Sequence, residues 1–255
     1  MTKIYIATHT DFESPVHHPV YEVLDSRRLF ATDVAPNGID ALFYSELLSY
    51  KYLADHPNLL PDIVGFCGYR KYYSFMDDVP DIESLIIQRG CIATTPHHTC
   101  RTLANYQKQS ISVYDQYARC FFFGDMDVMK AVVHSRHPEL WATFNSMLAG
   151  DWLYTCNMFI MRRCDFLEMM HVVWDCLDAW LEVVGTDVYR RIIQHEACYL
   201  QKPSGTLCQL EHQFRIGGNL GERIVSAFIM RYFPQAITYD IVFTEKARRH
   251  RQLIV

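Results

Sequence analysis

Residues 62–73, DIVGFCGYRKYY, contain the stretch that decides the expected fold. The apolar run from Ile63 to Cys67 is typical of an interior strand of a parallel sheet, because such strands are buried on both faces. Proteins of the α/β class bind ligands beyond the carboxyl ends of these strands. The residues that follow the run are Gly68, Tyr69, Arg70, Lys71, Tyr72 and Tyr73. We therefore expect a buried strand that carries two cations and three phenols to one rim of a sheet.

The two cations suit an anion-binding site at that rim. Arginine holds phosphate oxygens in pairs through its planar guanidinium, and lysine supplies a compact point charge. The alternative is that Arg70 and Lys71 are solvated at a strand end, with their stems lying over the tyrosines. The local sequence leaves both interpretations open.

Composition excludes several classes of protein. With 255 residues, 50% of them hydrophobic and 14% aromatic, the chain can bury a sizeable core and is not disordered. A net charge of −5 argues against a dedicated nucleic-acid binder, which usually carries a basic face. We expect a single domain over residues 1–255 and no nucleic-acid partner.

Cysteine usage and the amino terminus indicate a cytoplasmic protein. The nine cysteines are an odd number without a dense pairing framework, and Met1 runs into a strand-like KIYIA segment with no signal peptide. No apolar run approaches the ~20 residues that cross a bilayer. We expect reduced thiols and a cytoplasmic location, with peripheral attachment to a membrane as an alternative.

The order of expected elements predicts an α/β fold. Strands are expected at residues 3–8, 63–67 and 154–161, and helices at residues 37–54, 106–123, 165–184 and 220–232. Residues 84–94 fit either a strand or a helix followed by a strand. Asp165 and Glu168 form a capping-box pattern, and Gly185 is the expected end of that helix. Strands that alternate with helices indicate a Rossmann-type, mostly parallel central sheet flanked by helices.

Two short motifs resemble metal sites. The two carboxylates of Asp125 and Asp127 form a DxD pattern that can coordinate Mg²⁺ or Mn²⁺ on a diphosphate, but the same residues suit the start of a helix. A zinc site is the second candidate, and its ligands would be Cys91, His97, His98 and Cys100. Structural zinc usually needs tighter paired ligands than these, so a loop with incidental thiols is the alternative.

Two polar residues stand in apolar surroundings. Asn157 interrupts an expected strand, and burying its amide costs free energy unless its hydrogen bonds are satisfied. Its partner is either the backbone or a sugar hydroxyl. Glu222 follows Gly221 at an expected helix start, where it is either a general base or a carboxylate that interacts with the helix dipole.

Five segments occur in an order that resembles a known family. They are IYIATHT (4–10), NGIDALFYSELLSYKYLADH (37–56), DIVGFCGYRKYY (62–73), CNMFIMRR (156–163) and GNLGERIVSAFI (218–229). The chain resembles the family catalogued as domain of unknown function 4422, found in capsular and other exopolysaccharide synthesis proteins. Its members are regarded as glycosyltransferases with a GT-A-like fold. The resemblance runs from about Lys3 to Met230.

The resemblance implies a hexosyltransferase that moves a sugar from a nucleotide-sugar, with a UDP-sugar favoured, to a glycan or glycolipid acceptor of surface or capsular polysaccharide. Negative charge develops on the leaving diphosphate and needs stabilisation. We expect Arg70 and Lys71 to supply it without a metal cofactor, and Mn²⁺ or Mg²⁺ on Asp125 and Asp127 is the alternative. The implied nucleotide-sugar-binding half is about 1–100, and the acceptor and catalytic half is about 101–255.

The resemblance also implies roles for individual residues. The expected donor-binding residues are Thr8, His9, Asn37, Ser45, Glu46, Tyr69, Arg70 and Lys71. The expected sugar- or acceptor-binding residues are Asn157, Met158 and Arg215. The candidate bases for the acceptor hydroxyl of an inverting reaction are Glu222, Asp125 and Asp127.

The chain departs from the family's pattern in two places. The family's strand-end motif usually reads HYRRY, and here Gly68 replaces its His and Lys71 its second Arg. Asp125 and Asp127 also fall at an expected helix start, whereas GT-A enzymes carry DxD at a strand end. The departures leave two alternatives, a non-catalytic carbohydrate-binding subunit of a polysaccharide-synthesis complex and a metal-dependent hydrolase that uses the residues around 91–100.

Overall fold

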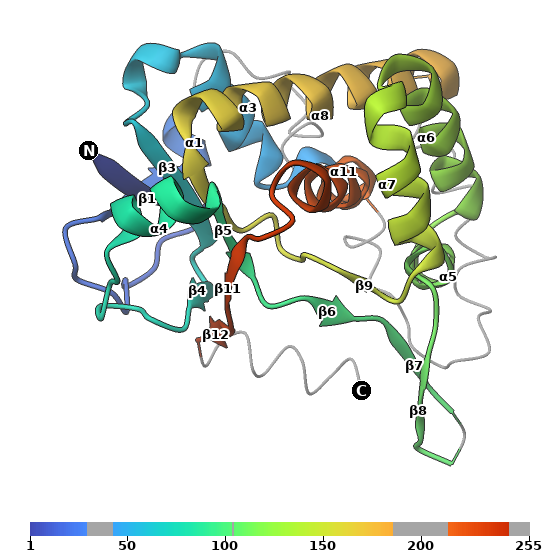
Figure 1. The fold of residues 1–255 in the computed structure, drawn as a ribbon, viewed down its shortest axis with the longest axis horizontal. Helices are drawn as coiled ribbons and strands as arrows, with labels where there is room; N and C mark the ends of the chain where they lie inside the picture. Colours follow the sequence, from blue (N-terminus) through green and yellow to red (C-terminus); the bar gives the residue numbers. More distant parts are fainter. Residues whose placement is uncertain (30–42, 104, 186–213, 245–255) are drawn as a thin grey trace.

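The computed structural model describes residues 1–29, 43–103, 105–185 and 214–244 (Figure 1). Its main sheet has the strand order β11–β5–β10–β3–β1–β2. The bounds are β1 Thr2–Thr8, β2 Tyr21–Asp25, β3 Ile63–Gly68, β5 Cys91–Thr94, β10 Phe159–Arg162 and β11 Ile237–Tyr239. Asn37, the expected start of a helix, lies outside the described residues.

The sheet is mostly parallel, as the sequence predicts. Strand β1 pairs in parallel with β2 and β3, and β5 pairs in parallel with β11. Strand β10 alone on this path runs the other way, because it is antiparallel to both β3 and β5. The amino end of β10 therefore lies at the same sheet edge as the carboxyl ends of β1 and β3.

Helices cover both faces of the sheet. They are α1 Ser26–Leu29, α3 Leu47–Asp55, α4 Ile82–Arg89, α5 Val113–Cys120, α6 Phe123–Arg136, α7 Pro138–Ala149, α8 Arg163–Val184 and α11 Ile216–Tyr232. Alternate residues of β1 divide between two apolar clusters, since successive strand side chains point to opposite faces. Tyr5 and Ala7 face the cluster that includes α3, α8 and α11, whereas Ile4 and Ile6 face the cluster that includes α4.

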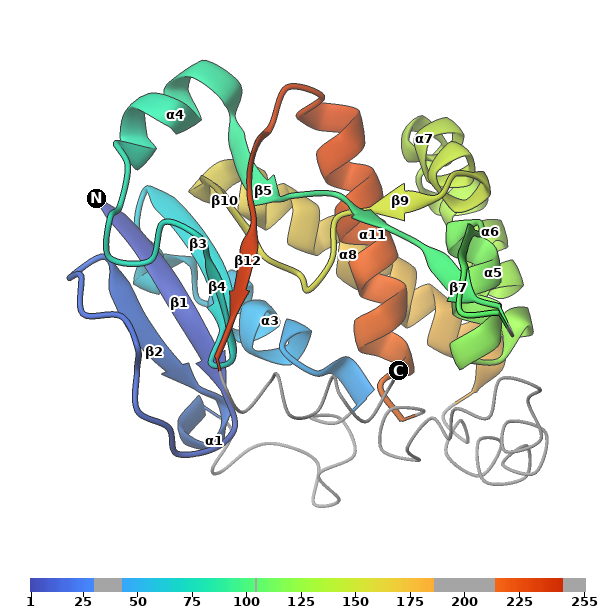
Figure 2. The same ribbon diagram turned by 90° about the horizontal axis from the view of Figure 1, so that it is seen from below.

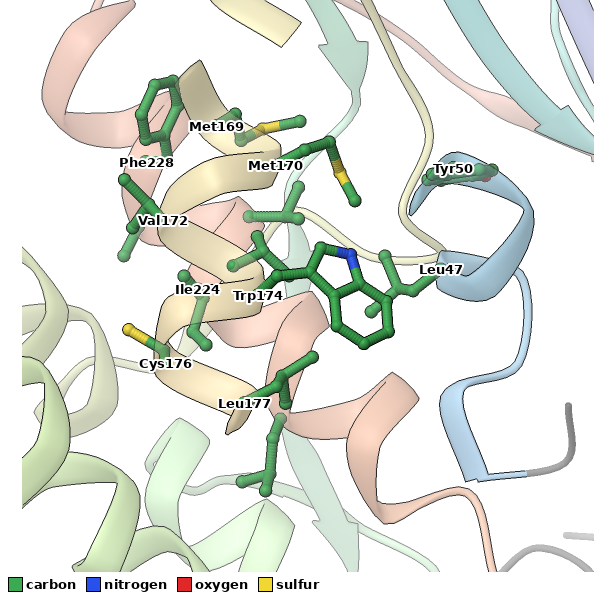
Figure 3. Close-up of a cluster of buried hydrophobic side chains, with 14 of the residues drawn as sticks. Leu47, Tyr50, Met169, Met170, Val172, Trp174, Cys176, Leu177, Ile224 and Phe228 are labelled. Carbon is green, nitrogen blue, oxygen red and sulfur yellow. The ribbon is translucent and has the colours of Figure 1, made fainter. Parts of the chain in front are cut away.

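The larger cluster joins α3, α8 and α11 (Figure 3). Leu47 of α3 lies beside Trp174 of α8, and Tyr50 of α3 and Ile224 of α11 belong to the same cluster. Beyond it, α6 and α7 pack together and against α8 and α11. The remaining short elements are the 3₁₀ turn η1 Pro57–Leu59 and strands β4 Lys71–Tyr73, β6 His97–His98, β7 Cys100–Thr102, β8 Lys108–Ser110, β9 Trp152–Leu153 and β12 Ile241–Phe243.

Two expected boundaries are wrong, those of the segments 106–123 and 154–161, whereas 84–94 is the helix followed by a strand that the sequence offers as one of two alternatives. The helix expected at 106–123 begins only at Val113, because the residues before it pair as β8 with β7. The ambiguous segment 84–94 belongs to helix α4 and strand β5. The strand expected at 154–161 begins at Phe159, since the preceding residues form a turn with positive φ angles.

The ends of the long helices are partly as expected. Gly185 follows α8 with a φ of 84°, which confirms it as the helix end. The start of α8 is earlier than expected, so Asp165 lies in the first turn and accepts a hydrogen bond from Arg162 Nε at 2.9 Å. Helix α11 also begins earlier, at Ile216.

Glycines let α11 approach the segment before α3 closely. A Cβ on Gly217 would lie 2.5 Å from Phe43 Cε1, and one on Gly221 would lie 2.3 Å from Leu47 Cδ1. Real Cβ atoms do not approach other heavy atoms this closely, so a side chain at either position would force movement. This contact places the first turns of α11 beside the start of α3.

Candidate active site

Strand β3 ends in a tight hairpin, and the polar residues that follow the strand enter different surroundings. Gly68 pairs with Lys71, the first residue of β4. Tyr72 and Tyr73 are buried in β4, where Tyr72 Oη donates to Tyr69 O and Tyr73 Oη to Phe66 O, each at 3.2 Å. The expectation that three phenols reach the rim is therefore wrong for two of them, because β4 turns them into the core.

Basic side chains follow the ends of three parallel strands, with His9 after β1, Arg27 after β2 and Arg70 after β3. Together with Arg215, which precedes α11, we call them the basic edge. Figure 2 shows the ends of β1 and β2 on the same lower side as the start of α11, which Arg215 precedes. The ring centroids of His9 and Tyr69 lie 5.4 Å apart, and Arg70 Cζ lies 4.9 Å from the Tyr69 centroid. These contacts bring the end of β1 and the β3–β4 turn together.

The electrostatics of His9 show how closely these cations gather. Burial lowers the pKa of the His9 imidazole, and the charges of Arg215, Arg70 and Arg27 lower it further. The charge of Arg27 is offset, because its guanidinium pairs with Asp25 at 2.7 Å and with Asp11 at 2.6 Å. Among the described residues no carboxylate forms an ion pair with Arg70 or Arg215, so their charges remain available to an anion.

A second group lies at the start of β10; we call Glu46, Lys71, Cys156, Asn157 and Glu222 the carboxylate cluster. Asn157 Nδ2 donates to Glu46 Oε1 at 2.9 Å, and Cys156 N donates to Glu222 Oε1 at 2.5 Å. Lys71 Nζ donates to Cys156 Sγ at 3.2 Å. The cluster thus joins elements that are distant in the sequence: the starts of α3, β4 and β10 and the first turns of α11.

The turn at Cys156 and Asn157 holds a strained backbone. Their φ angles are 72° and 49°, in a region that residues with a Cβ adopt at a cost of about 1–3 kcal/mol each. The contacts to Glu46, Glu222 and Lys71 hold the turn, and Tyr50 Oη also donates to Asn157 O at 3.1 Å. Asn157 is only 3% exposed, yet its Oδ1 has no hydrogen-bond partner among the residues that the structure describes. A buried acceptor without a partner is rare and fits a ligand hydroxyl.

Lys71 is a charged member of this cluster. Burial by itself would lower the pKa of its ammonium, but Cys156, Glu46 and Glu222 outweigh burial, so the pKa is raised. Lys71 therefore balances the charge of two carboxylates. Arg70 and Lys71, which the sequence assigns to one anion site, belong to different groups in the structure.

Arg223 is a buried charged residue beside Glu222 that the sequence analysis did not single out. It is 1% exposed, and its guanidinium donates to Glu222 Oε2 and Asn219 O at 2.9 Å and to Gln116 Oε1 at 2.6 Å. Its Cζ also lies 5.4 Å from the Tyr117 centroid. The signal in the sequence is an arginine at helical spacing from Leu220 and Ala227, on the apolar side of α11.

The other expected donor and sugar residues are dispersed around these groups. Thr8 closes a turn after β1, because its hydroxyl donates to Thr10 O at 2.7 Å. Ser45 has a φ of 52° and immediately precedes Glu46. Met158 is buried in the apolar cluster on the α4 side of the sheet.

The structure does not bring Asp125 and Asp127 together with Glu222. Both lie in the first turns of α6, where residues two apart point to different sides of a helix. Asp125 is fully buried and its backbone carbonyl accepts a hydrogen bond from Trp180 Nε1, whereas Asp127 is exposed and accepts one from Tyr114 Oη at 3.0 Å. The pair does not present two carboxylates to one ion.

The expected zinc ligands do not converge either. Cys91 is buried in β5, and His97, His98 and Cys100 are exposed on β6 and β7. In the part of the chain that the structure describes, no three His, Cys, Asp or Glu side chains stand close enough to hold a metal ion. In the same part, no helix is long and apolar enough to cross a membrane.

Comparisons with known proteins agree with this architecture. The model of the family described as "Domain of unknown function (DUF4422)" matches residues 3–202. The solved apo structure of WbbM, a bifunctional glycosyltransferase, is similar in fold, with a TM-score of 0.68 and 16% sequence identity. The match covers 96% of this chain and 45% of WbbM, so this chain spans less than half of that protein. A comparison with curated protein sequences finds no match.

Proposed function

This chain belongs to the DUF4422 family, and we propose that it is a glycosyltransferase that uses a nucleotide-sugar donor and a glycan acceptor. The observation that carries the proposal is the meeting of the basic edge and the carboxylate cluster at one edge of the sheet. Sugar transfer with inversion of configuration from such a donor needs positive charge for the leaving diphosphate and a base, such as a carboxylate, for the acceptor proton. The fold shared with WbbM, itself named a glycosyltransferase, adds support.

In this proposal the basic edge binds the donor's phosphates. Arg70 and Arg215 have no partner carboxylate among the described residues, and a guanidinium binds two phosphate oxygens at once. Negative charge grows on the diphosphate as the bond to the sugar breaks, so these cations stabilise the transition state more than the bound donor. Gly68 leaves space beside them, since a Cβ there would meet no heavy atom within 4 Å.

The carboxylate cluster then binds the reacting sugar. The unpartnered Asn157 Oδ1 accepts a hydrogen bond from a sugar hydroxyl and fixes the orientation of the ring. The strained turn at Asn157 supports this function. Backbone strain that neighbouring residues hold in place is typical of preorganised ligand-binding sites. A carboxylate of the cluster takes the proton of the acceptor hydroxyl.

Further parts of the proposal rest on the family resemblance. They are a GT-A-like arrangement in one domain, a UDP-sugar donor, a hexose as the transferred group, a capsular or surface polysaccharide as the product, and a cytoplasmic or peripheral membrane location. No metal cofactor is assigned, because the cations of the basic edge supply the charge that a metal would bring.

A panel of nucleotide-sugars tests the proposal directly. Purified protein is titrated with UDP-, GDP-, CMP- and dTDP-sugars, and both binding and slow donor hydrolysis are followed with EDTA and with added Mn²⁺. We expect saturable binding of one donor class and hydrolysis that survives EDTA. Failure to bind any donor would refute the transferase proposal, and activity that requires Mn²⁺ would refute its metal-free form.

A further inference from the structure

We propose that Glu46 is the catalytic base of the transfer and that Glu222 is a positioning residue. The sequence analysis assigns Glu46 to donor binding and Glu222 to catalysis, so this inference moves the catalytic role from Glu222 to Glu46. The inference rests on the proposed function, because it identifies the group that takes the acceptor proton in that reaction.

Both oxygens of Glu222 already have hydrogen-bond partners. Oε1 accepts from Cys156 N, and Oε2 accepts from the buried guanidinium of Arg223 at 2.9 Å. The Glu222 side chain is 18% exposed and Arg223 is 2% exposed, so this pair is shielded from solvent. Proton transfer to Glu222 would break its pairing with a buried cation and leave that cation uncompensated, which costs several kcal/mol. Glu222 is therefore suited to hold the Cys156–Asn157 turn.

Glu46 has one oxygen held and the other open. Oε1 accepts from Asn157 Nδ2 at 2.9 Å, and among the described residues no hydrogen bond reaches Oε2. A general base needs this arrangement, because one hydrogen bond fixes the carboxylate and the second oxygen stays available to take a proton. Its partner is also Asn157, whose unpartnered Oδ1 is the proposed sugar contact. The same amide thus links the base to the bound hydroxyl.

The backbone around Glu46 is shaped to place it there. Ser45, with a φ of 52°, turns the chain immediately before Glu46, which stands at the N-cap position of α3 without using its side chain to cap the helix. Gly218 of α11 makes room for this turn, because a Cβ at Gly218 would lie 3.1 Å from the Ser45 side chain. Lys71 is close enough for Glu46 to influence its pKa. The ammonium balances the carboxylate before the reaction.

The proposed step moves one proton and exchanges one bond. The acceptor O–H proton goes to Glu46 Oε2 while the acceptor oxygen forms a bond to the anomeric carbon of the donor sugar. The bond from that carbon to the diphosphate oxygen breaks, and its electron pair leaves with the nucleoside diphosphate toward the basic edge. No oxidant, reductant or metal enters this balance.

Paired amide substitutions test the assignment. Glu46→Gln keeps an acceptor oxygen for Asn157 but cannot take a proton. We expect kcat to fall by roughly 10²–10⁴-fold, the usual contribution of a general base, with donor affinity unchanged within about threefold. The loss of rate on the acid side of the pH profile should disappear in this variant. Glu222→Gln should reduce thermal stability but keep that acid-side loss of rate. Glu182→Gln, at an exposed ion pair with Arg136, serves as the matched control with no change.

The outcomes separate the inference from the proposed function. If the wild-type protein transfers sugar and Glu46→Gln keeps its kcat and pH profile, the assignment to Glu46 is overturned while the transferase function stands. If the wild type turns over no donor with any acceptor offered, both are overturned. Should Glu46→Gln unfold, Glu46→Asp replaces it, and the expected result is a lower kcat with the acid-side loss of rate retained.

Discussion

Arg70 and Lys71 are neighbours in the chain, but their side chains belong to regions with opposite properties. The carboxylate cluster around Lys71 is a nearly closed network, in which strained backbone, two carboxylates and an ammonium hold one another. The basic edge around Arg70 is open, because Arg70 and Arg215 form no ion pair with a carboxylate among the described residues. The first region is built to keep its shape, and the second is ready for an anion.

The largest expected effect comes from removing the two uncompensated cations of the basic edge. The double substitution Arg70→Ala and Arg215→Ala should weaken donor binding by about 10²–10⁴-fold, because each hydrogen bond to a charged group contributes about 1.5–3 kcal/mol. Isothermal titration with the donor found in the panel measures it. Thermal stability should be unchanged, because neither side chain pairs with a described carboxylate. Arg89→Ala, which loses only a contact to Gln235, is the matched control.

Neutralising Lys71 should have the opposite pattern, with stability affected more than donor affinity. Lys71→Met leaves Glu46 and Glu222 without the ammonium between them, and we expect the free energy of unfolding to fall by about 2 kcal/mol. Urea unfolding measures this change. The control is Lys130→Met, which removes an ammonium that lies 5.6 Å from the centroid of the Tyr114 ring. Unchanged stability together with a large loss of donor affinity would place Lys71 with the basic edge and contradict the division of the site.

The smallest expected effect is a proton taken up by His9 when the donor binds. Burial and the neighbouring guanidiniums lower the pKa of His9, which disfavours the charged form of the ring. A bound diphosphate cancels part of that positive charge and raises the pKa. Binding should therefore take up a fraction of a proton and become tighter as the pH falls from 8 to 6, by up to about tenfold.

Calorimetry in two buffers with different ionisation heats measures that uptake. The observed binding enthalpies should differ between the buffers for the wild type and agree for His9→Asn. Equal enthalpies for the wild type would show that the anion does not bind beside His9, which would move the donor phosphates away from the basic edge.

Local patterns predicted the parts of the fold that depend on neighbouring residues. The apolar run Ile63–Cys67 forms a buried strand that pairs in parallel with β1 but antiparallel with β10, and Gly185 ends α8 with a positive φ. The 106–123 segment was mistaken for one helix because nothing local reveals that its first part pairs with β7. The direction of β10 was equally hidden, since an apolar strand has the same pattern in either direction.

The sequence by itself determined which chemical groups the site contains. The glycines of α11, the cations after β3 and the polar residues Asn157 and Glu222 are all visible in the chain. Only the tertiary structure decided which of them share an environment. Arg70 and Lys71 separate because Arg70 lies in the turn between β3 and β4, whereas Lys71 is the first residue of β4. Glu46 meets Asn157, 111 residues away, because β10 runs antiparallel and the glycine face of α11 packs against the start of α3.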